Sequence, residues 1–230
     1  MKNGDEMTVV AFLILFPFLA ALVLSQMKKP GKVRDWFVYL SSALIVGAVI
    51  YLTAVSVPEG GSRSWLVETR FLDRVILAGE FALMILVFYY GFKFRKYYVV
   101  LLSAAQTLPV GWMELSGRGI EGETHLLVDN LTVIMCLVVG IVGSLICVYA
   151  VGYLKDYHKH HPEYRDRSPF FFSMLFVFLG AMFGLVFSAS LTWMYFFWEI
   201  TSICSFLLIG YNQSELAVRN SFKALWMNLL

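Results

Sequence analysis

Apolar runs of about 20 residues, separated by short charged loops, recur along most of this sequence. A 20-residue helix is about 30 Å long, which matches the hydrocarbon core of a bilayer. We therefore predict an all-α fold, a polytopic bundle of transmembrane helices with about seven full spans and the start of an eighth. The spans are expected at about residues 7–25, 36–57, 75–92, 97–113, 129–153, 169–188 and 191–211, with a last helix from about residue 216.

The composition agrees with a membrane protein. Of the 230 residues, 59% are hydrophobic and only 15% are charged, whereas soluble domains carry about 25% charged residues. The net charge of +2 gives no indication of nucleic-acid binding. A cleavable signal peptide is not expected, because Lys2, Asp5 and Glu6 precede the first span and no A-x-A site follows it.

The charged loops predict the orientation of the spans. With the N-terminus outside, the cytoplasmic segments contain twelve lysines and arginines and the outer segments contain five. The positive-inside rule then predicts a multi-pass protein of the inner (cytoplasmic) membrane with an outer N-terminus. The cytoplasmic set is Lys28, Lys29, Lys32, Arg34, Lys93, Arg95, Lys96, Lys155, Lys159, Arg165, Arg167 and Arg219, and the outer set is Lys2, Arg63, Arg70, Arg74 and Arg118.

The three cysteines predict no redox centre. Cys136, Cys147 and Cys204 all lie inside predicted spans, and the sequence has no CxxC pair. Buried, reduced thiols are the simplest interpretation. We expect no cofactor in this chain, so any redox chemistry linked to it would take place in another subunit.

A cluster of histidines follows the fifth span. His158, His160 and His161 lie among Lys155, Lys159 and other basic residues, which repel cations. A solvated loop is therefore preferred to a metal site.

Glu199 is the first candidate for function. It lies two residues from the centre of the run Leu191–Tyr211, LTWMYFFWEITSICSFLLIGY. A charge at that depth costs about 3 kcal/mol or more, so the carboxylate either pairs with a cation or takes up a proton. A proton-carrying site needs the same property. The alternative is a buried ion pair that only fixes the packing of the helices.

Lys223 is the predicted partner of Glu199. It lies about 10 Å from the cytoplasmic end of its helix, and Glu199 lies about 18 Å from the same side. The offset of about 8 Å exceeds a direct contact, but a stretched lysine or an intervening water could close it. The alternative is a lysine that extends to the headgroups.

Four further residues are candidate accessories. Ser202 and Ser205 lie near Glu199 and could help to hold water. Glu80 is about five residues inside its span, where partial exposure at the interface competes with a role in transport. Asp129 precedes Asn130-Leu131-Thr132, so an N-cap is its simplest role, and closure of an outer vestibule is the alternative.

Three segments resemble the antiporter-like membrane subunits of the complex I superfamily. The family has an xDgLs-type opening, then a helix with W-E-x5-S-x-x-L-I-G followed by Phe or Tyr, then a helix that starts K-A-F/L-x-x-N. Here the segments are VDNLTVIM at Asp129, YFFWEITSICSFLLIGY around Glu199 and NSFKALWMN around Lys223. The resemblance covers about residues 129–230. We count four spans before the opening instead of the usual two, which looks most like the large membrane subunit of energy-converting (Ech-type) nickel–iron hydrogenases. NADH-quinone oxidoreductase subunit L and Mrp antiporter subunits are the alternatives.

The resemblance implies translocation of protons, or of sodium in some members, by a buried pair in which Glu199 and Lys223 match the family glutamate and lysine. It also implies other membrane-arm subunits and a peripheral redox module as partners. The principal lysine of the family would lie beyond Leu230, so we expect a C-terminally truncated chain. Residues 1–128 are predicted to form N-terminal transmembrane helices, and residues 129–230 the first part of the ion-translocation domain. A subunit of a multisubunit Mrp-type antiporter, and a scaffold without transport, remain the competing hypotheses.

Overall fold

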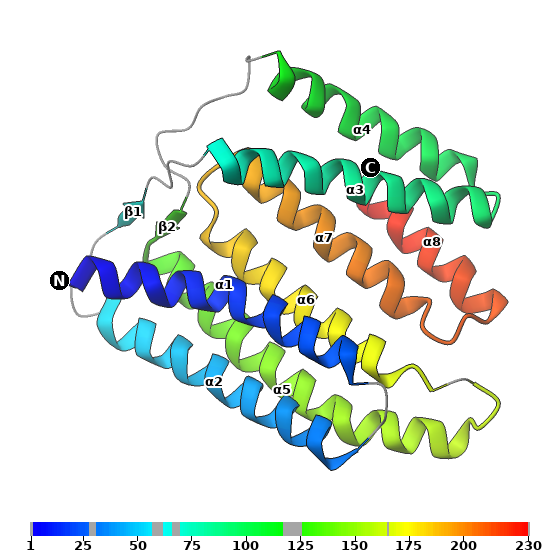
Figure 1. Ribbon diagram of the computed structural model, residues 1–230, viewed down its shortest axis with the longest axis horizontal. Helices are drawn as coiled ribbons and strands as arrows, with labels where there is room; N and C mark the ends of the chain where they lie inside the picture. Colours follow the sequence, from blue (N-terminus) through cyan, green and yellow to red (C-terminus); the bar gives the residue numbers. More distant parts are fainter. Residues whose placement is uncertain are drawn as a thin grey trace.

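A computed structural model describes residues 2–27, 31–56, 62–65, 70–116, 126–164 and 166–229. Within these residues the chain forms eight α-helices and two short β-strands (Figure 1). The all-α prediction is confirmed. The elements are α1 (Lys2–Gln26), α2 (Lys32–Ser56), β1 (Arg63–Trp65), α3 (Arg70–Lys93), α4 (Tyr97–Leu115), β2 (Leu126–Val128), α5 (Asn130–His160), α6 (Ser168–Phe187), α7 (Leu191–Ile209) and α8 (Glu215–Leu229).

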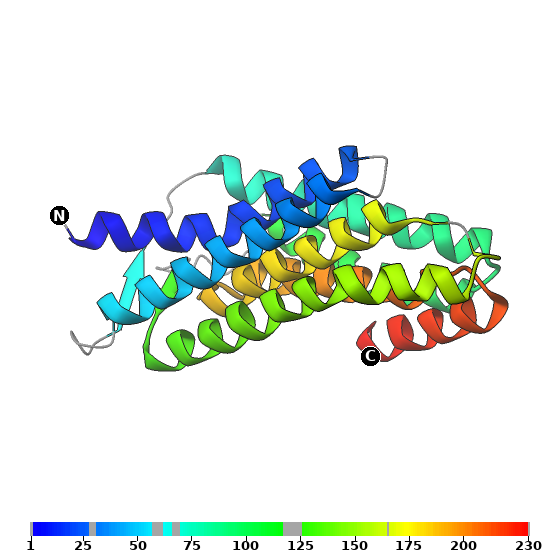
Figure 2. The ribbon, with the colours of Figure 1, turned by 90° about the horizontal axis from the view of Figure 1, so that it is seen from below.

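Six of the described helices are long and apolar enough to cross a membrane, namely α1, α2, α3, α5, α6 and α7. The fourth predicted span forms α4, a helix of 19 residues with Pro109 inside it, which is not among the six. The last helix, α8, has 15 residues. Seen from below, the helices still run lengthwise along a common axis (Figure 2), as membrane-crossing helices do.

Several helix ends differ from the prediction, including the starts of α2 and α3, which begin four to five residues early. Helix α1 starts at Lys2 and not at about residue 7, so Glu6 lies inside the helix. Helix α5 continues to His160, so the first part of the expected loop, residues 155–168, is helical. Polar residues do not end a helix by themselves. The end of α5 is set by Pro162, because the residue before a proline disfavours helical backbone.

The helix ends alternate between two ends of the bundle. At the end that holds the N-terminus, β1 pairs antiparallel with β2, and Ser64 lies opposite Leu127 (Figure 1). Arg63 of β1 forms an ion pair with Glu6 of α1, and Leu126 of β2 bridges to Ser188 after α6. The connections α2–α3, α4–α5 and α6–α7 therefore share one end, and the other four connections share the opposite end. Successive membrane crossings require this arrangement.

Helix α6 is the centre of the bundle, and it packs against α1, α5 and α7. Four of its phenylalanines, Phe172, Phe176, Phe183 and Phe187, are fully buried. Small residues let the neighbouring helices approach, as is usual for helix contacts in lipid. A Cβ added at Gly184 would lie 2.5 Å from the Phe197 ring of α7, so only glycine fits there.

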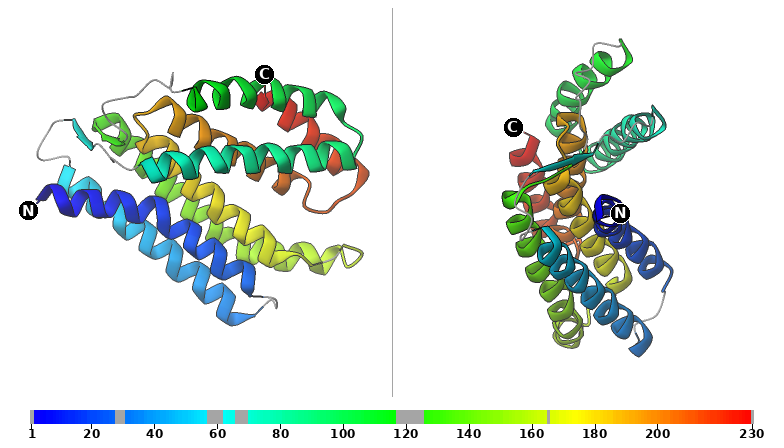
Figure 3. Two further views of the ribbon diagram at one scale, coloured as in Figure 1. Left: turned by 45° about the horizontal axis from the view of Figure 1, so that its top comes forward. Right: turned by 90° about the vertical axis from the view of Figure 1, so that its left-hand side faces the viewer.

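Helices α3 and α4 form an antiparallel hairpin on the side of the bundle occupied by α7 and α8. Helix α3 packs against α4 and α7, and α4 packs against α8. Figure 3 shows the hairpin on the opposite side of the molecule from α2. The turn between the two helices includes Arg95 with a φ of 56°. This hairpin supplies one wall of the site described next.

Candidate functional site

Glu199 lies in the middle of α7 and is half-buried. The hydroxyl of Tyr195, one helical turn earlier, donates a 2.6 Å hydrogen bond to its Oε1 atom. The contact between Tyr195 and Glu199 follows from the sequence, because residues four apart lie on the same face of a helix. The bond orients the carboxylate but brings no positive charge.

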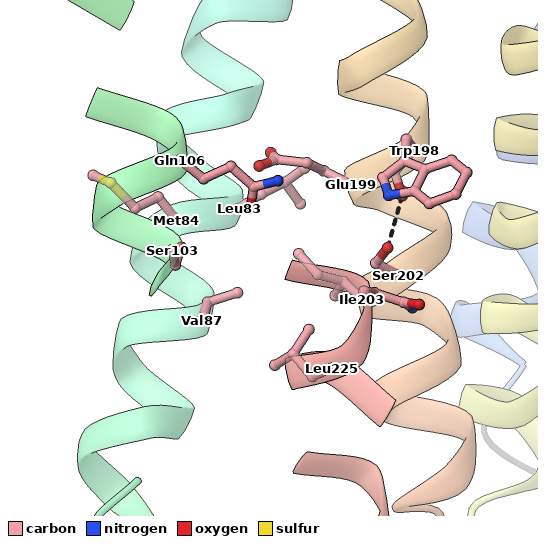
Figure 4. Close-up of a pocket in the computed structure, with 11 residues that line it drawn as sticks. Leu83, Met84, Val87, Ser103, Gln106, Trp198, Glu199, Ser202, Ile203 and Leu225 are labelled. Atoms are coloured by element: carbon pink, nitrogen blue, oxygen red, sulfur yellow. Dashed lines mark hydrogen bonds between the residues drawn. The ribbon is translucent and has the colours of Figure 1, made fainter. Parts of the chain in front are cut away.

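The carboxylate faces a pocket between four helices (Figure 4). The pocket has room for a water molecule. Glu199 therefore points into protein and not toward hydrocarbon. The lining residues are Leu83, Met84 and Val87 of α3, Ser103 and Gln106 of α4, Trp198, Glu199, Ser202 and Ile203 of α7, and Leu225 and Asn228 of α8.

Two polar atoms in this pocket are buried without a hydrogen-bond partner in the described part of the chain. They are Oε2 of Glu199 and Oε1 of Gln106. The two side chains point toward one another across the pocket (Figure 4). Unsatisfied buried oxygens are rare, and a water held between them would satisfy both. The pocket can thus hold a proton on Glu199 and the water that brings it.

The structure does not bring Lys223 to Glu199. Lys223 is exposed on α8, while Phe222 and Leu225 of the same helix are buried. Asn228 and Leu225, and not Lys223, are the α8 residues that line the pocket. Among the described residues, Glu199 forms no ion pair. The pairing was predicted from the depths of Glu199 and Lys223 in the membrane. Depth along a helix does not determine on which face of α8 the lysine lies.

The predicted serines occupy different positions. Ser202 is buried, lines the pocket and donates to the Trp198 carbonyl oxygen at 3.0 Å. Ser205 donates to the Thr201 carbonyl oxygen at 2.9 Å and is not a lining residue. Both hydroxyls are used by their own helix, a common arrangement for serine in helices. Only Ser202 adjoins the pocket.

Asp129 is the N-cap of α5, as the simplest interpretation predicted. Its Oδ1 accepts a 2.7 Å hydrogen bond from the backbone N–H of Thr132. This bond holds the pKa of the Asp129 carboxyl below its ordinary value, because it stabilises the charged form. Asp129 does not line the Glu199 pocket.

Glu80 is fully buried on α3, with 1% of its surface exposed, so the alternative of partial interfacial exposure is wrong. It lies on the same helix face as Leu83, Met84 and Val87, which line the pocket. The adjacent Gly79 packs on α7, where an added Cβ would lie 2.6 Å from the Phe196 ring.

Tyr195 and the polar residues of α4 were not among the predicted site residues. The surroundings of the Tyr195 hydroxyl include Glu80 of α3 and Thr107 of α4 as well as Glu199. The spacing of four residues between Tyr195 and Glu199 is a signal that could have identified it. Gln106 and Ser103 carried no such signal, because only tertiary packing brings α4 to α7.

A second polar cluster lies at the opposite end from the strands. Asp35 of α2 binds the buried Arg34 guanidinium at 3.2 Å and Lys155 Nζ at 2.5 Å. Arg34 also lies over the Phe172 ring, 5.0 Å from its centroid. These contacts tie the start of α2 to the end of α5 and the start of α6, so the cluster is structural.

The histidine segment lies beside this cluster. His158 contacts the Tyr211 hydroxyl at 3.3 Å, whereas His160 and His161 are exposed. Burial alone would raise the pKa of Asp166, but hydrogen bonds from Ser168 and the nearby His158 and Arg34 together lower it. Among the described residues there is no group of three metal-ligating side chains. His158 is packed and not solvated, which differs from the predicted loop.

The three cysteines Cys136, Cys147 and Cys204 are free and buried, as predicted. Several basic residues of the charged-loop argument, such as Lys28, Lys29, Arg118 and Arg165, lie outside the described residues.

Comparison with known proteins identifies two family regions. Residues 112–165 match the family described as NADH-ubiquinone oxidoreductase (complex I), chain 5 N-terminus. Residues 188–230, which contain Glu199 and Lys223, match the family described as NADH:quinone oxidoreductase/Mrp antiporter, transmembrane. Helix α3 and most of α4 lie outside both matches.

Individual relatives agree with the family matches. The chain is 32% identical over 120 residues to the Na(+)/H(+) antiporter subunit A1 of Staphylococcus haemolyticus, which covers 50% of this chain and 13% of that protein. It is 32% identical over 126 residues to the NAD(P)H-quinone oxidoreductase chain 5 of Picosynechococcus, covering 48% of this chain and 18% of the relative. It is 33% identical over 144 residues to the Na(+)/H(+) antiporter subunit A1 of Staphylococcus aureus, which covers 62% of this chain and 16% of that protein.

These matches span less than a fifth of the length of the relatives, so they identify the family and not the activity of a whole protein. The predicted motifs at Asp129, Glu199 and Lys223 all fall inside the matched regions. Residues 112–165 and 188–230 thus match the superfamily of antiporter-like membrane subunits shared by NADH:quinone oxidoreductases and Mrp antiporters.

Proposed function

We propose that this chain is part of a membrane subunit that translocates protons, or sodium ions, and that Glu199 carries the ion through the middle of the bilayer. One observation carries the proposal: Glu199 sits in the centre of α7, faces a pocket between four helices, and keeps one carboxylate oxygen without a hydrogen-bond partner among the described residues. A carboxylate in that setting binds a proton or a cation readily, because its ionised form is costly there. Residues 129–230, which contain Glu199 and Lys223, are proposed as the first part of the ion-translocation domain.

Lys223 is the cation that we propose as the switch for Glu199. The two are apart in the structure, so pairing requires α8 to turn about its axis or to be displaced by a neighbouring subunit. A pair that forms and breaks can change the energy of the charged carboxylate by about 1.4–4 kcal/mol. Moving a proton against 100 mV requires about 2.3 kcal/mol. The two energies are of the same size, which coupling needs.

We propose a redox-driven complex as the setting, either an energy-converting hydrogenase or a complex I-like oxidoreductase with other membrane-arm subunits and a peripheral redox module. The relative named NAD(P)H-quinone oxidoreductase chain 5 supports this assignment. The second candidate is a multisubunit Mrp-type antiporter, favoured by the relatives named Na(+)/H(+) antiporter subunit A1. The excess of basic residues at one end of the bundle supports an outer N-terminus.

The test is Glu199→Gln in the full-length protein within its native complex. Proton movement into inside-out membrane vesicles is monitored with a pH-sensitive acridine dye. The movement is driven either by the electron donor of the host or by NaCl added after respiration has built a proton gradient. We expect at least a tenfold loss of proton movement in one of these two modes, with normal amounts of assembled complex. The mode that is lost distinguishes the redox-driven pump from the antiporter.

A matched control is Glu163→Gln, the same chemical change on an exposed carboxylate of the α5–α6 connection. It should transport like the unmodified protein. Wild-type transport in Glu199→Gln would contradict the proposal. Loss of assembly in that variant, with transport per assembled complex unchanged, would instead support a scaffold.

A further inference from the structure

The α3–α4 hairpin interrupts a connection that is otherwise short. Strands β1 and β2 are direct antiparallel partners, with Arg63 opposite Val128 and Trp65 opposite Leu126. A tight turn would be enough to join such a pair, yet the chain between them contains two long helices. The family matches begin only at residue 112, near the end of α4. The hairpin therefore lies upstream of nearly all of the residues that the family models match.

The α3–α4 hairpin completes the Glu199 pocket. Five of the lining residues, Leu83, Met84, Val87, Ser103 and Gln106, come from α3 and α4. The contact with α7 is close, since the Gly79 backbone approaches the Phe196 ring so tightly that a Cβ would not fit. Glu80, the next residue, is thereby held at the level of Tyr195 and is removed from solvent.

Two carboxylates act on the Tyr195 hydroxyl. The hydroxyl donates to Glu199 at 2.6 Å and interacts electrostatically with Glu80. Thr107, a buried hydroxyl of α4, is a further neighbour of the Tyr195 hydroxyl. A phenol can pass a proton without a lasting charge, because it both donates and accepts hydrogen bonds.

We propose that Glu80, Tyr195 and Glu199 form a proton relay, in which the α3–α4 hairpin supplies a second proton-carrying carboxylate to α7. The inference rests on the proposed function of Glu199 and adds a route by which protons reach or leave it. The hairpin is then part of the transport path and not only a lateral support.

The transfer is balanced in protons and involves no redox change. The O–H bond of Tyr195 breaks as an O–H bond forms on the Glu199 carboxylate. The Tyr195 oxygen regains a proton from the carboxylic acid of Glu80, through the Thr107 hydroxyl or a water. The net result is that Glu80 becomes a carboxylate, Glu199 becomes a carboxylic acid and Tyr195 is unchanged. The reverse sequence returns the proton.

The experiment compares Glu80→Gln, Glu80→Asp and Tyr195→Phe with Glu199→Gln in the same vesicle assay of the full-length protein in its complex. We expect at least a tenfold loss of proton movement per assembled complex in Glu80→Gln and Tyr195→Phe, and substantial recovery in Glu80→Asp. A packing role would not predict this recovery, because aspartate restores the acid but not the shape. The control for the tyrosine is Tyr89→Phe, an exposed position on α3.

The outcomes separate the two proposals. Full transport in Tyr195→Phe, which removes one hydroxyl and keeps the ring, would overturn the relay even if Glu80→Gln failed to assemble. Full transport in Glu80→Gln would overturn it as well. If Glu199→Gln is inactive in either case, the proposed function stands without the relay. If Glu199→Gln transports normally, both proposals fall.

Discussion

Tyr195 holds Glu199 by a 2.6 Å hydrogen bond from one turn earlier on the same helix, so the carboxylate has a fixed donor on one oxygen and, within the described part of the chain, none on the other. The bonded oxygen sets the orientation of the side chain. The other oxygen faces the pocket, where a proton or a cation can reach it. The candidate site thus depends on two residues of α7 and on the helices that cover them.

Close packing of α6 on α7 predicts that Gly184→Ala is destabilising. The new methyl group would lie 2.5 Å from the Phe197 ring, and overpacking of this kind costs about 1–3 kcal/mol. Gly152→Ala is the control, because a Cβ there meets nothing within 4 Å. Thermal unfolding of the detergent-solubilised protein should show a lower midpoint only for Gly184→Ala. Equal midpoints for the two variants would contradict the packing.

The Arg34–Asp35 pair predicts unequal effects for its members. Asp35→Ala removes the carboxylate that binds the buried Arg34 guanidinium, which costs about 3–5 kcal/mol. Lys155→Ala removes a mostly exposed partner and should cost less than about 1 kcal/mol. Chemical denaturation in mild detergent measures both. If Lys155→Ala destabilised the protein as much as Asp35→Ala, the assignment of Asp35 as the counter-ion of Arg34 would be wrong.

The cap at Asp129 predicts a loss of about 1 kcal/mol in Asp129→Ala and a smaller loss in Asp129→Asn, which keeps an acceptor. The pKa of Asp129 is lowered by the Thr132 N–H, so the charged cap contributes its full stability above the ordinary value of 3.8. That contribution is lost as the pH falls through the lowered pKa. Unfolding midpoints measured across acidic pH should therefore fall less for Asp129→Asn than for the unmodified protein.

Pairing of β1 with β2 predicts a disulfide between Ser64→Cys and Leu127→Cys, which are directly opposite in the antiparallel register. Opposite positions in an antiparallel pair have Cα atoms about 4.5–5.5 Å apart, a separation that a disulfide spans. Mild oxidation of the double variant should shift its mobility on a non-reducing gel, and reduction should reverse the shift. The pair Ser64→Cys with Ser116→Cys is a control without strand pairing. Equal cross-linking of both pairs would argue against the register.

The long apolar runs predicted the helices because the length and hydropathy of a span can be read from consecutive residues, without knowledge of its neighbours in space. The cap at Asp129 was predictable for the same reason, since it needs only the next three residues. The end of α5 was missed because charged residues such as Lys155 remain compatible with a helix and Pro162 sets the limit.

The candidate site was predicted only in part. Glu199 is identified by a charge in an apolar run, a signal within one helix. The rotation of α8, which exposes Lys223, depends on which of its side chains pack on neighbours, and Phe222 and Leu225 take that face. The contributions of Gln106 and Glu80 depend on how the α3–α4 hairpin docks on α7, which no local pattern records.

The most direct test of the central claim is to observe the protonation of Glu199 itself during turnover. Infrared difference spectroscopy of the full-length complex detects the carbonyl stretch of a protonated carboxylic acid. The account predicts that turnover changes such a band in the unmodified protein and that this change is absent in Glu199→Gln but present in Glu163→Gln. An identical band change in Glu199→Gln would show that another group carries the proton, and would contradict the account.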